Sequence, residues 1–193
     1  NMRPELYDFT VFNRIEPGKK IILLLDDSHG IGVLRKNGIS LDKSSFQQVN
    51  IELIVVASLA KGLATDAGLI LADEERIKYF KRSNFYTGAS PSSPASLYAF
   101  IHGEQIYLRQ FEKLQYNINS FKAHMGSELN AVANFPVFSS TDTGLYARLM
   151  NAGVLVSSFP YPLATDPLLN RIVVNAHHTK ADLDQLSHAI GIY

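Results

Sequence analysis

The chain has 193 residues, 46% hydrophobic and 19% charged, and its 18 Lys+Arg balance its 18 Asp+Glu. This composition is typical of a folded globular protein and excludes a disordered one. A zero net charge gives no basic surface for nucleic acid or for an anionic membrane, so neither is expected as a partner. The absence of cysteine excludes disulfides and thiolate chemistry and fits a reducing, cytoplasmic compartment.

Three apolar segments in the first half are predicted to be strands of one parallel sheet. Residues 20–26, 51–57 and 67–72 are such segments, and continuous apolar runs are typical of parallel strands covered on both faces. Asp73 is predicted to cap a charged helix that runs to Arg82. Few crossover helices accompany these strands, so we expect the rest of the sheet to lie outside this sequence.

The second half is predicted to form a long linking helix and then a small α+β unit. Ser93 and Pro94 open the helix, because Pro suits the first helical position. Thr179 and Asp182 have capping-box spacing before a last helix. Between them the sequence predicts strands at 136–139, 153–158 and 171–176 and a helix at 142–152. The predicted fold class is therefore α/β, with the end of a mostly parallel large domain at 1–92, the helix at 93–120 and a small α+β domain at 121–193.

Chemically useful side chains follow the first two predicted strands. Asp26 and His29 come after the first strand, whereas Ser58 and Lys61 come after the second. Ligands of open α/β sheets sit beyond the carboxyl ends of the strands, so an acid and an amine there can face one ligand. An amine that condenses with an aldehyde, an acid that pairs with a ring nitrogen and hydroxyls for a phosphate fit pyridoxal phosphate. Arg171 could hold a substrate carboxylate through two parallel hydrogen bonds.

Each of these features also has a simpler interpretation. A lysine after a strand is usually solvated, and an arginine at the start of a strand is usually in a surface ion pair. The Asp26-Asp27-Ser28-His29 cluster could bind a metal, but such clusters are more often turns. Only the ordered set of acid, amine and guanidinium favours a cofactor site.

Four segments resemble motifs of the α-oxoamine synthases, a family of fold-type I pyridoxal-phosphate enzymes in the aminotransferase class I/II superfamily. The segments are LLLDDSHGIGVLRKNG, IVVASLAKGL, NFYTGASPSSPA and NRIVVNAHHTKADLDQL. The resemblance covers nearly the whole chain and implies that Asp26 pairs with the pyridine nitrogen and that His29 contacts the ring. It also implies that Lys61 is the Schiff-base lysine and Ser58 a phosphate ligand.

The remaining roles also come from the resemblance. Thr87 falls where a hydroxyl reaches the phosphate of the neighbouring subunit, and Arg171 falls on the arginine that binds the substrate carboxylate. The resemblance implies no metal, a cytoplasmic homodimer with its site at the interface, and a missing N-terminal half. It implies a catalytic set of Lys61, Asp26 and His29.

The expected activity is a condensation of an amino acid with an acyl-CoA. Two alternatives stay open: a class I/II aminotransferase that uses a keto acid, and a non-catalytic remnant or fragment that needs the missing half.

Overall fold

The structure is a computed structural model that describes residues 2–16, 18–41 and 50–191. The chain forms two compact units. Residues 7–108 make the N-terminal unit, and residues 109–193 together with residues 1–6 make the C-terminal unit. The division predicted at residues 92 and 120 stays a prediction. Within the described ranges, no helix has the length and apolar character needed to cross a bilayer.

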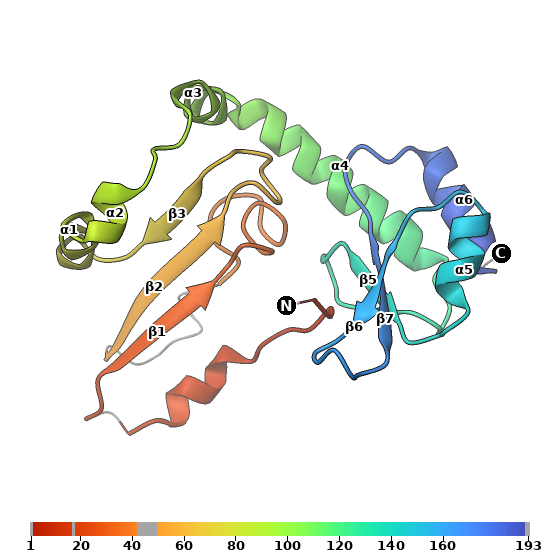
Figure 1. Cartoon of the computed structure of the whole chain (residues 1–193), viewed down its shortest axis with the longest axis horizontal. Coiled ribbons are helices and arrows are strands. Elements are labelled where there is room, and N and C mark those ends of the chain that lie inside the picture. Colours follow the sequence, from red (N-terminus) through yellow and green to blue (C-terminus); the bar gives the residue numbers. More distant parts are fainter. Residues whose placement is uncertain (1, 17, 42–49, 192–193) are drawn as a thin grey trace. The chain divides into compact units, whose positions relative to one another are not determined.

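The N-terminal unit contains a three-stranded sheet in the order β1-β2-β3 (Figure 1). β1 (Ile21–Asp26) and β2 (Ile51–Ser58) are parallel, as predicted. β3 (Gly68–Leu71) is antiparallel to β2, so the predicted all-parallel pairing is wrong for this strand. The reason is the short connection over residues 59–67, because a parallel return needs a crossover of a dozen or more residues.

Described residues cover β2 on both faces, since its successive residues Ile54 and Val55 are both buried. Ile31, Ala57 and Leu59 form a buried cluster on one face of the sheet, with Phe100 packed against it. On the edge strand β1, Ile22 is 55% exposed and Leu24 64% exposed. The predicted burial on both faces therefore holds for β2 and is wrong for β1, because no described helix between β1 and β2 covers Ile22 and Leu24.

The helices include the two that the sequence predicts after Asp73 and after Ser93, with one difference in the second. η1 (Phe9–Arg14), α1 (Glu74–Lys81) and α2 (Asn84–Gly88) are short. Asp73 accepts a hydrogen bond from the Arg76 amide, which confirms the predicted cap of α1. The segment predicted as one long helix forms α3 (Pro94–His102) and α4 (Glu104–Ala123), because α3 ends at Gly103.

The C-terminal unit is a four-stranded antiparallel sheet in the order β4-β5-β7-β6, which confirms the predicted α+β character. Its strands are β4 (Asn130–Ala131), β5 (Val137–Ser140), β6 (Ser157–Pro160) and β7 (Leu168–Val173). β6 and β7 are displaced from the predicted 153–158 and 171–176. β6 begins late because Gly153 adopts a left-handed conformation that ends the preceding helix.

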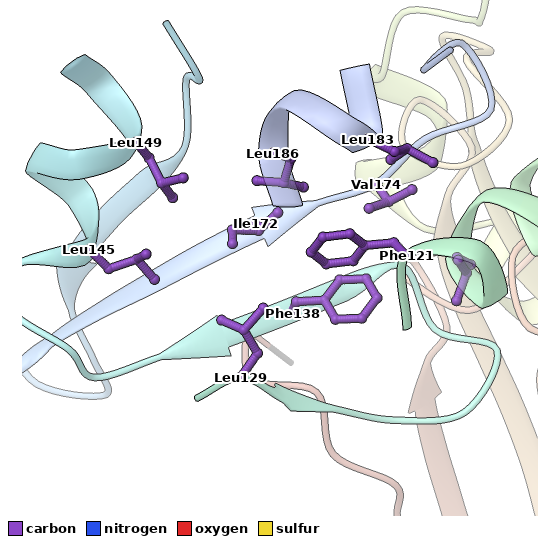
Figure 2. Close-up of a cluster of buried hydrophobic side chains, with 10 residues drawn as sticks. Phe121, Leu129, Phe138, Leu145, Leu149, Ile172, Val174, Leu183 and Leu186 are labelled. Carbon is purple, nitrogen blue, oxygen red and sulfur yellow. The ribbon is translucent and has the colours of Figure 1, made fainter. Parts of the chain in front are cut away.

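Helices α5 (Leu145–Asn151) and α6 (Lys180–Ile190) pack on one face of this sheet, where leucines of both helices meet Ile172 (Figure 2). Phe121 of α4 and Phe138 of β5 pack edge to face, with ring centroids 4.7 Å apart. The predicted capping box of α6 is formed by Thr179 and Asp182. Since Ile172 faces the core and side chains alternate along a strand, Arg171 lies on the opposite face of β7.

Candidate functional site

The carboxyl ends of β1 and β2 bring two sequence-distant loops together. Asp26 is the last residue of β1 and Ser58 the last of β2, and parallel pairing places both at the same edge of the sheet. The loops are joined by hydrogen bonds, since the Asp27 amide donates to Val56 O at 2.8 Å and the Ser58 amide donates to Ser28 Oγ at 2.9 Å. The local order of this edge therefore depends on residues 27 and 28.

Asp26 is the acid of this edge, and its surroundings keep it ionised. Its Oδ1 accepts a hydrogen bond from the Ser28 amide at 2.9 Å. Hydrogen bonds from Ser28 lower the pKa of Asp26 most, and the positive charges of Lys61 and then His29 lower it further. The turn that carries Lys61 follows β2, the parallel neighbour of the strand that ends at Asp26.

Lys61 lies in a turn between β2 and β3, and its side chain is exposed. The turn is closed at its base, where the Leu59 amide donates to Ala67 O at 2.9 Å and the Thr65 amide donates to Leu59 O at 3.2 Å. Gly62 follows Lys61, and a Cβ there would come within 2.8 Å of Val33 and 3.0 Å of Ile31 O. Close packing against the loop after β1 therefore requires glycine at this position.

A cavity of about 690 Å³ opens beside these loops and has a mostly apolar lining. Ser28 and Ser58 line one part of it, and Phe80 of α1 and Tyr86 of α2 line another. Asp26 is in register with Val56, which lines the cavity, although Asp26 itself does not line it. Two hydroxyls thus border an apolar space next to the strand end that carries the acid.

Asp27 has a structural environment that the sequence did not reveal. Its side chain is buried and accepts hydrogen bonds from the Ser40 amide, at 2.8 Å, and from the Ser40 hydroxyl. Its carboxylate therefore holds the loop after β1. Across the described ranges, no group of three or more His, Cys, Asp or Glu side chains is arranged to hold a metal ion.

Thr87 lies on α2 and is exposed. Its hydroxyl donates to Ser83 O of its own helix turn at 3.1 Å. A role toward the phosphate of a second subunit stays a prediction for this residue.

Arg171 belongs to the C-terminal unit and lies in register with Ser139 on one side and Ser157 on the other. Its Nε is buried and has no hydrogen-bond partner, and burial lowers the pKa of the guanidinium. Among the described residues, no carboxylate forms an ion pair with Arg171. A partly desolvated cation without an internal counter-ion is suited to an external anion.

The structure adds residues to the site that sequence analysis missed. Ser28 bonds both to Asp26 and to the Ser58 amide. The Asp26 side chain accepts from the amide two residues further on, which is an Asx turn. An aspartate at the end of a strand often forms such a turn, so Asp26 could have indicated the role of the Ser28 amide. Thr65 and Tyr107 hold the Lys61 turn, but their contact spans 42 positions and leaves no local signal.

The fold defines a class of protein. Solved structures with matching folds are fold-type I pyridoxal-phosphate enzymes, and the part they match is the C-terminal portion. The serine palmitoyltransferase of Sphingomonas wittichii matches with a TM-score of 0.70 at 15% identity, over 92% of this chain and 55% of that one. The 8-amino-7-oxononanoate synthase of Francisella tularensis matches with a TM-score of 0.64 at 23% identity, over 87% and 52%.

In sequence, the chain is similar to curated proteins named 8-amino-7-oxononanoate synthase, which agrees with the family that its motifs resemble. It is 25% identical to the 8-amino-7-oxononanoate synthase of Fervidobacterium nodosum, over 84% of this chain and 44% of that protein. It is 26% identical to the enzyme of the same name from Marinobacter nauticus, over 99% and 52%. The chain thus spans about half the length of the curated relatives it matches. No protein-family model matches it.

Proposed function

We propose that the chain is part of a pyridoxal-phosphate-dependent transferase of the α-oxoamine synthase type, in which Lys61 carries the cofactor. The observation that supports this most is the electrostatic proximity of Lys61 and Asp26 at the ends of adjacent parallel strands. The enzymes that the chain resembles in sequence and fold support the same reading.

The side chains of the N-terminal unit fit the cofactor's chemical groups. The Lys61 amine suits an aldehyde. The Asp26 carboxylate, with its lowered pKa, suits a protonated ring nitrogen, and the Ser28 and Ser58 hydroxyls suit a phosphate. His29 follows Asp26 by three residues in the same loop, and its charge also lowers the pKa of Asp26, so it is the candidate for contact with the ring.

Each residue has a distinct task in the proposed reaction. When bound, pyridoxal phosphate supplies a ring that withdraws electrons and stabilises negative charge at the amino acid's Cα. Lys61 would hold the cofactor through Nζ and, with its amine free, would take the proton from Cα as a general base. Asp26 would hold the ring nitrogen in its protonated form. Arg171 binds the substrate carboxylate.

The proposed reaction joins the amino acid to an acyl group. In this reaction a bond would form between Cα and the carbonyl carbon of an acyl-CoA, the carbon–sulfur bond would break, and the CoA thiolate would leave with the proton that Lys61 had taken. In most members of the family that the motifs resemble, the carboxylate is then lost as CO₂. An aminotransferase would instead release no CoA and would convert a keto acid into an amino acid.

We also propose that the active protein is a cytoplasmic homodimer with shared sites and that it includes a region equivalent to the front half of the relatives. The exposed Ile22 and Leu24 on the edge strand β1 support a need for further sheet. Phe85 of α2 is 92% exposed beside Thr87, which supports a subunit contact there. Sedimentation equilibrium tests the dimer.

Cofactor attachment tests the central claim. Purified chain mixed with pyridoxal phosphate should gain visible absorbance, and borohydride should fix the label to the peptide that contains Lys61. Lys61→Ala should abolish the label, whereas Lys78→Ala, which removes an exposed lysine of α1 paired with Glu74, should not. Label on another lysine, or no label, would exclude a cofactor role for Lys61 in this chain and favour a non-catalytic remnant.

A second assay identifies the reaction class. Protein mixed with pyridoxal phosphate, without borohydride, is given an amino acid with either an acyl-CoA or a keto acid. Thiol release with the acyl-CoA supports the synthase, and amino-group transfer to the keto acid supports the aminotransferase.

A further inference from the structure

The turn that carries Lys61 has an unfavourable backbone of its own. Ala64 adopts a left-handed conformation with φ of 48°, which costs a non-glycine residue about 1 kcal/mol. Such a conformation persists only where surrounding contacts fix it. The residues on both sides of Ala64, namely Leu63 and Thr65, supply these contacts.

A tyrosine from α4 reaches into this turn. The Tyr107 hydroxyl donates to Leu63 O at 3.0 Å and lies 3.2 Å from Thr65 Oγ1. The Thr65 hydroxyl also reaches Leu63 O, at 3.1 Å, and Thr65 itself is buried. Because these bonds lie in a partly buried setting, loss of one partner leaves another polar group unsatisfied.

Tyr107 is held in place from its other side. Its ring packs edge to face against Phe100, with centroids 5.4 Å apart and planes at 64°. Phe100 packs against the buried cluster of Ile31, Ala57 and Leu59, which covers one face of the β1–β3 sheet. The tyrosine hydroxyl is therefore fixed relative to the strands that carry Asp26.

We infer that Tyr107, acting with Thr65, is a positioning residue that sets the turn of Lys61 relative to Asp26. The inference rests on the proposed role of Lys61 as the cofactor-binding amine. Lys61 lies two residues before Leu63, and its long side chain has many rotamers, so the backbone position decides where the amine can reach. A fixed turn keeps Lys61 beside Asp26 before any cofactor arrives.

The test replaces Tyr107 with Phe, which removes only the hydroxyl. Amide hydrogen exchange is measured at Leu59 and Thr65, whose amides close the turn. We expect exchange there to rise about five- to tenfold, the effect of losing one typical hydrogen bond on a local opening. The Asp26 carboxyl is titrated by NMR in the same samples, and its pKa should rise because Lys61 spends less time nearby.

Matched variants separate positioning from general stability. Tyr98→Phe removes a hydroxyl from an exposed tyrosine of α3, whose ring contacts His102, and should behave as wild type. Thr65→Val should reproduce the Tyr107→Phe effects, and Thr65→Ser should restore wild-type behaviour because it keeps the hydroxyl.

Two results would overturn the inference. One is unchanged exchange at Leu59 and Thr65 together with an unchanged Asp26 titration in Tyr107→Phe. The other is faster exchange shared equally by β1 and β2, which would assign Tyr107 to global stability alone. Neither measurement uses pyridoxal phosphate. A failure of cofactor attachment would therefore count against the proposed function, but it would not change the result of the exchange and titration measurements.

Discussion

Gly32 and Leu63 lie in direct contact, so that a Cβ on Gly32 would come within 2.4 Å of Leu63 Cδ2. Gly32 also has a φ of 70°, a conformation that side chains rarely adopt. The contact joins the loop after β1 to the turn that carries Lys61. The spacing of Asp26 and Lys61 therefore depends on a glycine six residues beyond the acid.

Gly32→Ala should destabilise the N-terminal unit by about 2 kcal/mol, because left-handed strain and crowding of Leu63 add together. Urea denaturation measures the change. Gly38→Ala is the matched control, since Gly38 has a φ of 83° but no described residue lies within 4 Å of its Cβ position. Gly38→Ala should be destabilised only by the left-handed strain, which costs about 1 kcal/mol. Equal losses in the two variants would show that the contact with Leu63 has no energetic weight.

Lys61→Met should raise the pKa of Asp26, because it removes one of the charges that lower it. The pKa should stay below its ordinary value, since the Ser28 hydrogen bonds, the larger cause, remain. NMR titration of the Asp26 carboxyl measures the change. Lys20→Met, at the other end of β1, serves as the control. Identical Asp26 titrations in wild type and Lys61→Met would mean that the amine and the acid are apart.

The same carboxyl makes stability depend on pH in a known direction. The pKa of Asp26 is lower in the folded chain than in the unfolded chain. Its interactions therefore stabilise the fold above the unfolded pKa, and this contribution is lost as pH falls through the folded pKa. Urea denaturation at a series of pH values measures this dependence. Asp26→Asn should reduce the fall in unfolding free energy at acid pH, and high salt should weaken the contribution that the charge of Lys61 makes to it.

Phe138→Ala should destabilise the C-terminal unit by about 3–5 kcal/mol, because the ring is fully buried and packs against Phe121. Thermal unfolding or urea denaturation gives the value. Phe85→Ala removes the same ring from an exposed site on α2 and should change stability by less than about 0.5 kcal/mol. Similar losses in both variants would contradict the packing described for the C-terminal core.

Arg171→Leu should leave the unfolding free energy unchanged or raise it by up to about 1 kcal/mol, because a half-buried cation without an ion-pair partner is costly to fold. Arg148→Leu breaks the exposed ion pair with Asp142 and should lower the unfolding free energy by about 0.5 kcal/mol. A loss above about 1 kcal/mol in Arg171→Leu would indicate a structural role instead of a reserved anion site.

Local patterns predicted many of the elements and failed where distant segments decide the outcome. The apolar runs predicted β1 and β2, and the caps at Asp73 and Thr179 were correct because each depends on residues within one helical turn. The direction of β3 was predicted wrongly, because it follows from the length of the turn that contains Lys61. The helix break at Gly103 was missed, because helical spacing continues on both sides of it.

The sequence by itself determined the order of acid, amine and guanidinium and the motifs that place the chain among α-oxoamine synthase-like proteins, since both are properties of residue type and spacing. Only the tertiary structure decided that Ser28 orients Asp26, that Asp27 holds a loop and that Tyr107 reaches the Lys61 turn. The physical reason is that hydrogen bonds and close packing between distant segments depend on positions in space, and a single sequence carries no local signal of them.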